Sequence, residues 1–177
     1  MASLPLTKPT EAPPFPAVQL ANTFIERYSD GGQIDHLKLQ KLCYYAYGWW
    51  LALSGEDAPL TRDKPQVWKL GPVFRPIYGA FASYRGGLID KKQKVGPFSG
   101  EDSIPVSERN ESQFVEWIWG RYGHFDGLKL SKMTHEPGTP WYKIAKEHDF
   151  VVPKFLEMND DENRSYFYNM ASEEGLI

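Results

Sequence analysis

Cysteine, long apolar stretches and basic charge are all scarce in this chain of 177 residues. The single cysteine, Cys43, excludes an intramolecular disulfide and is typical of a protein from a reducing compartment. No apolar run reaches the ~20 residues of a membrane-spanning helix, and Gly48 interrupts the longest one. Since no signal peptide is visible either, we expect a soluble cytoplasmic protein with no membrane partner.

The charge balance argues against nucleic acid as a partner. The formal net charge is −3 and the pI is about 5.8, so the chain has no general basic field for a phosphate backbone. The lysines of the segment 90–94 form too short a cluster for such a footprint and are typical of a solvated loop.

Motifs of common catalytic sites are missing as well. The chain has no Gly-x-Gly-x-x-Gly, no phosphate-binding loop and no Gly-x-Ser-x-Gly elbow. A zinc-protease helix needs a second histidine four positions after the first, but Thr139 stands four positions after His135. The other histidines, His36, His124 and His148, are scattered singly. We therefore expect no enzyme activity, no catalytic residue, no metal site and no cofactor, with a small metal-dependent hydrolase as the alternative.

Aromatic residues, in contrast, are abundant and concentrate between residues 38 and 53. Five of the seven residues from Tyr44 to Trp50 are aromatic, and a helical period defines one core-facing stripe that includes Cys43 as a small buried hydrophobe. The stripe consists of Leu39, Leu42, Cys43, Ala46, Trp50 and Leu53. A helix that is apolar nearly all round is either central to its domain or has a partner.

The rest of the chain predicts a mainly α, compact single-domain fold of six or seven helices. Residues 1–16 hold five prolines without an apolar period and predict a flexible leader, so the helical domain spans 17–177. Capping residues are expected at Asp35, Asp126, Thr139 and Asn159. Helices are expected near 18–28, 36–54, 76–84, 110–122, 127–133, 140–145 and 160–170. Alternating Ile and Val residues predict a small β-hairpin between Leu88 and Val106.

Three segments, in this order and at these intervals, resemble the Panacea-domain family. The most specific is Trp68–Tyr78, which reads Trp-Lys-Leu-Gly-Pro-Val-Phe-Arg-Pro-Ile-Tyr. The other two are Lys38–Ala46 and Leu130–His135, the latter followed by Pro140-Trp141. The family includes SocA-like antitoxins and phage-associated GepA-like proteins, and the resemblance covers roughly residues 17–167.

The resemblance implies a non-enzymatic antitoxin of a toxin–antitoxin system. Such a protein binds and neutralises a cognate protein toxin, which is often encoded by the adjacent gene. SocA-like members can also act as proteolytic adaptors that deliver a toxin to a protease, so a protease is a second possible partner. Neither the toxin nor the mode of neutralisation follows from the motif residues.

These residues fall into two groups, which are structural motif residues and candidates for partner binding. Gly71 and Pro72 are typical of a tight turn that aims the following helix, with Trp68 and Trp141 packed as structural motif residues. We expect a partner-binding edge on the aromatic helix, and two weaker candidates elsewhere. The edge is Lys38, Lys41, Tyr45 and Trp49; the weaker candidates are Tyr78 and His135.

Overall fold

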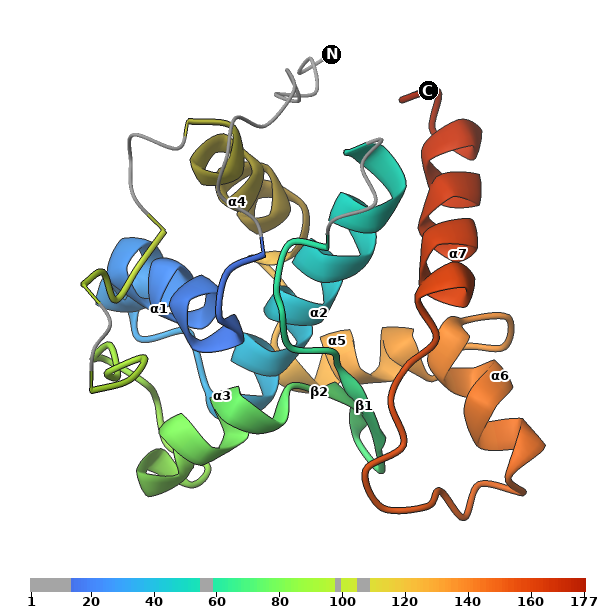
Figure 1. The fold of residues 1–177 in the computed structure, drawn as a ribbon, viewed down its shortest axis with the longest axis horizontal. Helices are drawn as coiled ribbons and strands as arrows, with labels where there is room; N and C mark the ends of the chain where they lie inside the picture. The colour runs from blue at the N-terminus through green and yellow to red at the C-terminus, as the bar shows by residue number, and fades with distance from the viewer. Residues whose placement is uncertain (1–13, 55–58, 98–99, 105–108) are drawn as a thin grey trace.

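The computed structural model describes residues 14–54, 59–97, 100–104 and 109–177 (Figure 1). Over these residues the fold is mainly α with one two-stranded antiparallel sheet, which confirms the expected fold class. The helices are α1 (Ala17–Tyr28), α2 (His36–Leu53), α3 (Arg75–Ala80), α4 (Arg109–Tyr122), α5 (Gly127–Thr134), α6 (Pro140–Glu147) and α7 (Asp160–Glu173). The strands are β1 (Gln66–Trp68) and β2 (Gly71–Val73).

Four helices begin where a side chain caps free backbone amides. Asp35 accepts a hydrogen bond from the Lys38 amide at 2.7 Å, and Asp126 accepts one from the Lys129 amide at 2.7 Å. Thr139 and Asn159 cap α6 and α7 in the same way. Because a cap acts within three residues of its own position, all four were predictable from the sequence.

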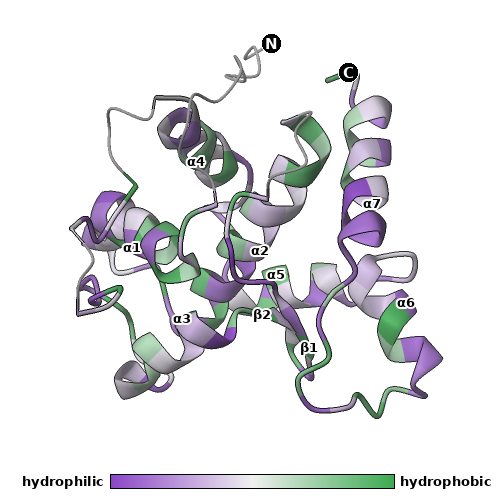
Figure 2. Cartoon of the chain, viewed as in Figure 1, coloured by the Kyte–Doolittle hydropathy of each residue, from purple (hydrophilic) through white to green (hydrophobic). Residues whose placement is uncertain are grey.

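Helix α2 lies at the centre of the molecule and packs against α1, α4, α5, α7 and β2 (Figure 1). Every residue from Lys38 to Leu51 is buried, including Cys43. Helix α7, which is largely hydrophilic (Figure 2), reaches α2 through Phe167. A Cβ on Gly48 would lie 1.9 Å from the Phe167 ring, so this glycine permits the close approach of the two helices.

The expected partner-facing edge of α2 is not exposed. Lys38, Lys41, Tyr45 and Trp49 are all buried, so the prediction that these side chains are presented at the surface is wrong. Trp49 donates its indole N–H to the hydroxyl of Tyr122 at 2.7 Å, and Tyr45 stacks on the same ring. The C-terminal end of α4 therefore covers Tyr45 and Trp49, while β2 covers Lys41, and no pattern within α2 reveals this.

The small hairpin is also not where the sequence analysis placed it. It is formed by β1 and β2, whereas the described residues between Leu88 and Ile104 contain no strand. Buried polar side chains of α1 bind this segment instead: Asn22 accepts from the Gln93 amide and donates to the Asp102 carbonyl. Hydrogen bonds to a helix thus replace the expected strand pairing.

Residues 1–13 of the expected leader lie outside the described residues. Phe15, which the sequence analysis assigned to the leader, is buried in the core. Its amide donates to the Leu60 carbonyl at 2.9 Å, and its carbonyl accepts from the Arg62 amide at 2.8 Å. Phe15 is therefore part of the packed core.

Candidate functional site

The three motif segments converge on the β1–β2 hairpin. The strands pair with Val67 opposite Pro72 and Trp68 opposite Gly71, so Lys69 and Leu70 form the tip. Helix α2 carries the first motif segment and packs on β2, while α5 and α6 carry the third and pack on β2 and β1. Segments about 30 and 60 residues away in the sequence thus surround an eight-residue hairpin.

The carbonyl oxygens at the hairpin tip each meet a side chain from a distant segment. Three consecutive carbonyls meet side chains from α5, from His135, which follows α5, and from α6. The pairs are Trp68 O with the Trp141 indole N–H (2.8 Å), Lys69 O with His135 Nε2 (3.0 Å) and Leu70 O with the Ser131 hydroxyl (2.8 Å). These three side chains therefore bind the hairpin from the side of α5 and α6. Their hydrogen bonds stabilise a pair of strands that is short and weak by itself.

Lys41 holds the second strand from the side of α2. Its ammonium is buried and donates to the Pro72 carbonyl at 2.7 Å. Burial lowers the pKa of this ammonium from 10.5 to about 7, because the charged form loses its hydration. Lys41 is thus a structural residue under the hairpin and not a surface contact.

Gly71 is required by its surroundings in two ways. Its φ of +101° lies in the left-handed region that favours glycine, and a Cβ there would lie 2.5 Å from Thr134 Oγ1 and 2.8 Å from Lys41 Cε. The Gly-Pro dipeptide therefore seats β2 directly against α2 and α5.

Sequence reasoning missed two residues of this arrangement, Gln40 and Ser131. The Gln40 amide makes two hydrogen bonds to Phe74, accepting from its N–H at 2.8 Å and donating to its C=O at 3.1 Å. Gln40 and Ser131 both lie inside the motif segments, where they are polar residues among apolar ones. A buried polar side chain needs a partner, and that signal could have identified them.

The outward face of the hairpin is apolar and open. Leu70 is 55% exposed and Tyr78 is 48% exposed, and the Tyr78 ring lies 4.9 Å from that of the half-buried Trp68. Beside them is a hollow of about 430 Å³, lined by residues that include Leu37, Trp68, Leu70 and Tyr78. His36 also lines this hollow, and burial lowers the pKa of its imidazole.

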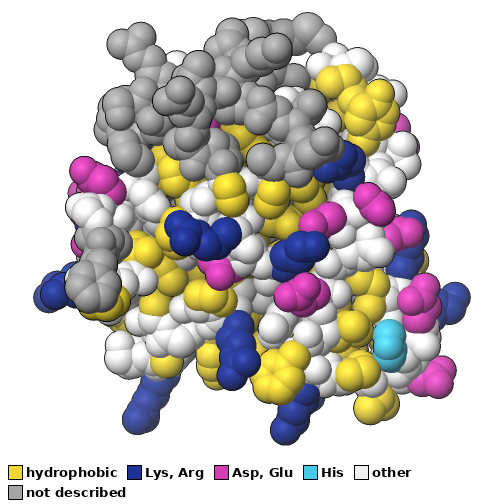
Figure 3. All heavy atoms as spheres, in the orientation of Figure 1, with side chains coloured by type: hydrophobic (Ala, Val, Ile, Leu, Met, Phe, Trp, Pro, Cys, Tyr) yellow, Lys and Arg dark blue, Asp and Glu magenta, His cyan; other side chains and the backbone are white. Residues whose placement is uncertain are grey.

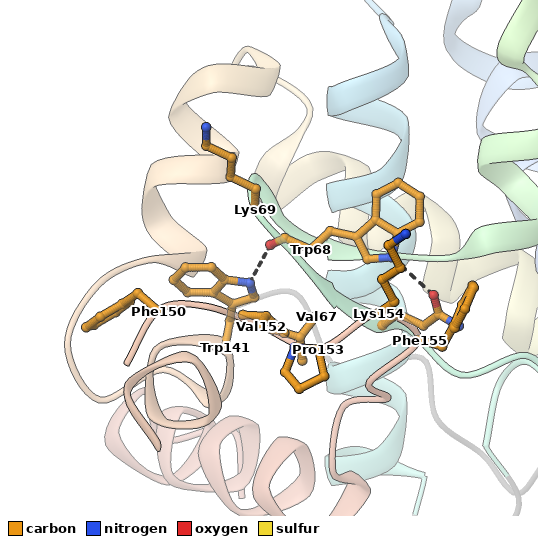
Figure 4. Close-up of a pocket in the computed structure, with 10 residues that line it drawn as sticks. Val67, Trp68, Lys69, Trp141, Phe150, Val152, Pro153, Lys154 and Phe155 are labelled. Carbon is orange, nitrogen blue, oxygen red and sulfur yellow. Dashed lines mark hydrogen bonds between the residues drawn. The ribbon is translucent and has the colours of Figure 1, made fainter. Parts of the chain in front are cut away.

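A second hollow of about 600 Å³ lies against β1 (Figure 4). Trp68 and Lys69 line both hollows, so the hairpin stands between them. We call the exposed surface of Trp68, Lys69, Leu70 and Tyr78 the hairpin platform. Exposed apolar side chains on a rigid support are typical of a protein-binding surface.

The structure therefore separates the sequence-predicted residues. Tyr78 lies on the hairpin platform, and His135 lies half-buried beneath it, 3.8 Å from the Trp141 ring. The structural motif residues Trp68, Gly71 and Trp141 meet at the hairpin.

Two further observations concern the whole described part of the chain. Within residues 14–54, 59–97, 100–104 and 109–177, no three His, Cys, Asp or Glu side chains gather in a group that could hold a metal ion. In the same ranges no helix combines the length and the apolar composition of a membrane span.

Comparison with known proteins places the motif segments in a family. The sequence model described as "Antitoxin SocA-like, Panacea domain" matches residues 39–142, more than half of the chain. Antitoxin SocA of Caulobacter vibrioides (strain NA1000 / CB15N) is 31% identical over 115 residues, which are 63% of this chain and 60% of that protein. The match thus spans less than two thirds of that relative's length, and no solved structure matches the chain. From its motif segments and this match, the chain belongs to the SocA-like, Panacea-domain antitoxin family.

Proposed function

We propose that this chain is the antitoxin of a toxin–antitoxin pair and that it neutralises its cognate toxin by direct protein–protein contact in the cytoplasm. The observation that carries the proposal is the hairpin platform, which exposes Leu70 and Tyr78 above a support that is hydrogen-bonded to the hairpin. The family supports a toxin as the partner. The adjacent gene is the proposed source of that toxin.

The support beneath the platform favours binding because it limits the entropy lost on association. Lys41, Ser131 and Trp141 hold the hairpin before any partner arrives. A stable complex buries on the order of 1,600 Å² and concentrates its affinity in a few aromatic anchors. Trp68 and Tyr78 are the aromatic anchors that the platform offers.

The same geometry favours binding over catalysis at this site. Lys38, Lys41 and Cys43, which are potential nucleophiles of the first motif segment, are all buried. Burial raises the pKa of the Cys43 thiol well above its ordinary value, which disfavours the reactive thiolate. None of these side chains lines either hollow beside the hairpin.

Co-expression with the product of the adjacent gene tests the proposal. We expect growth arrest by that product alone, rescue by this chain, and loss of both rescue and complex formation in Leu70→Asp and Tyr78→Asp. Tyr168→Asp is the matched control, because Tyr168 is 53% exposed and lines neither hollow beside the hairpin. Each variant is first shown to be folded by circular dichroism.

Two outcomes would contradict the proposal. An adjacent product that is not toxic, or whose toxicity persists beside the folded wild-type chain, removes the toxin–antitoxin pairing. Neutralisation that needs a protease, seen as a shortened half-life of the toxin without inhibition by purified components, assigns the chain to the adaptor role instead.

A further inference from the structure

The loop between α6 and α7 has an unusual backbone. Asp149, Phe150 and Phe155 all have φ between 52° and 65°, although none of them is glycine. Non-glycine residues are uncommon in this left-handed region, and such residues cluster at binding and active sites. Three of them within seven positions concentrate positive-φ backbone in the segment 149–155.

This loop also exposes apolar side chains. Val151 is 79% exposed, and Phe150 and Phe155 are both more than half exposed. Phe150 and Phe155 lie at opposite ends of the 600 Å³ hollow, whose other apolar walls include Val67 and Trp141 (Figure 4). Both rings thus line the hollow and remain exposed at its rim.

The loop is held in place at both ends. The Phe150 amide donates to the Ala145 carbonyl at 2.7 Å, and the Leu156 carbonyl accepts from the Val67 amide of β1 at 2.8 Å. The Phe155 ring lies under the guanidinium of Arg75, 4.7 Å from its centre. The exposed rings are therefore positioned in advance, which favours binding of a partner over collapse of the hollow.

The charges around the hollow are of one sign. Lys69 and Lys154 line it, and none of the described residues that line it is acidic; Asp149 and Glu157 flank the loop outside the lining. This is a local reversal in a chain whose net charge is −3. In Figure 3, Lys and Arg side chains stand beside hydrophobic ones along the lower part of the same face.

We propose that this hollow receives an apolar segment of the toxin that also carries a carboxylate, and that the loop 149–155 determines which toxin is bound. The proposal rests on the proposed antitoxin function. Aromatic side chains of the partner fit between Phe150 and Phe155, and its carboxylate pairs with Lys69 or Lys154.

The extent of the family match supports the role of the loop in specificity. The matched residues, 39–142, include the hairpin and its buried support but end before Asp149. The hairpin platform thus lies within the matched residues, while the loop that completes the hollow lies outside them. Related proteins that bind different partners are expected to share a structural support and to differ in the loops beside it. The hairpin support and the loop 149–155 have this arrangement.

The test uses the full chain and, as the probe, the purified product of the adjacent gene. The dissociation constant is measured at low and high salt for the wild type, Phe155→Asp and Lys154→Glu, with Tyr168→Asp and Lys91→Glu as matched controls. All four side chains are exposed, so folding is expected to persist and is checked by thermal unfolding. The mass of the free chain is measured in parallel.

We expect Phe155→Asp and Lys154→Glu each to weaken binding about 10-fold or more, the controls to stay within about 2-fold, and salt to weaken the wild type more than Lys154→Glu. A wild type that binds while both loop variants bind like the controls overturns the inference and leaves the proposed function intact. A free dimer that the loop variants convert to monomer, with unchanged toxin binding, assigns the surface to self-association and also overturns it. A wild type that does not bind the probe refutes the proposed function, and the inference with it.

Discussion

The ammonium of Lys41 donates a 2.7 Å hydrogen bond to the carbonyl of Pro72 in a site without solvent exposure. This contact joins the first family motif segment to the second. It explains why a lysine stands in the middle of an apolar helix, since its function is to hold the strand that supports the binding surface. Four predictions follow from this contact and from the packing around α2.

The first prediction concerns pH. The folded Lys41 ammonium has a pKa of about 7, whereas the unfolded one titrates near 10.5. Between these values the unfolded state binds more protons, so the free energy of unfolding rises with pH, by up to about 1.4 kcal/mol per pH unit from this group. Below pH 7 both states are protonated and the contribution is flat; above about pH 10 tyrosines, whose folded pKa values are raised by burial, reverse the trend.

Urea unfolding between about pH 6 and pH 9.5 checks this, with Lys41→Met as the reference variant. The wild type should gain stability relative to Lys41→Met as the pH rises. Parallel pH profiles for the two proteins would show that Lys41 is charged in the folded state throughout this range.

The second prediction concerns Gly71. Gly71→Ala should destabilise the fold by about 2 kcal/mol or more, because the left-handed backbone and the contact with Thr134 both oppose a Cβ. Gly138→Ala is the matched control, since its φ of +94° is similar but no atom lies within 4 Å of the added Cβ. Chemical denaturation measures the free energy of unfolding of both variants. If Gly71→Ala and Gly138→Ala lose the same amount, backbone strain alone accounts for the effect and the close packing of the hairpin contributes nothing.

The third prediction concerns the contact of α7 with α2. Gly48→Ala places a Cβ 1.9 Å from the Phe167 ring and should cost about 2–3 kcal/mol, with faster hydrogen exchange in α7. Gly120→Ala, in α4 with open space around the added Cβ, should instead stabilise by about 0.5–1 kcal/mol. Similar stability of the two variants would show that α7 does not dock as described.

The fourth prediction assigns Trp49 to the core. Trp49→Ala removes a fully buried indole and its hydrogen bond to Tyr122, so the free energy of unfolding should fall by about 3–5 kcal/mol. The free energy of unfolding should fall by less in Trp49→Phe. A Trp49→Ala protein that keeps its full stability but no longer binds the toxin would contradict this prediction. It would show that Trp49 contacts the toxin.

Local signals account for what the sequence predicted correctly. Asp35 and Asp126 cap helices through amides three residues away, and the stripe through Leu39 and Trp50 follows from the helical period. The hairpin was misplaced for the opposite reason. Its strands are only three residues long, and side chains from distant segments, such as Lys41 and Trp141, hold it in place.

The sequence by itself determined the helices, the fold class and the family, because caps, periods and motif spacing all act along the chain. Only the tertiary structure decided that Lys41 and Trp49 are buried while Leu70 and Tyr78 are exposed. A helix that is apolar on every side does not show which neighbour covers each face. That depends on where α4, α7 and the hairpin pack, and such long-range contacts are made only in the folded chain.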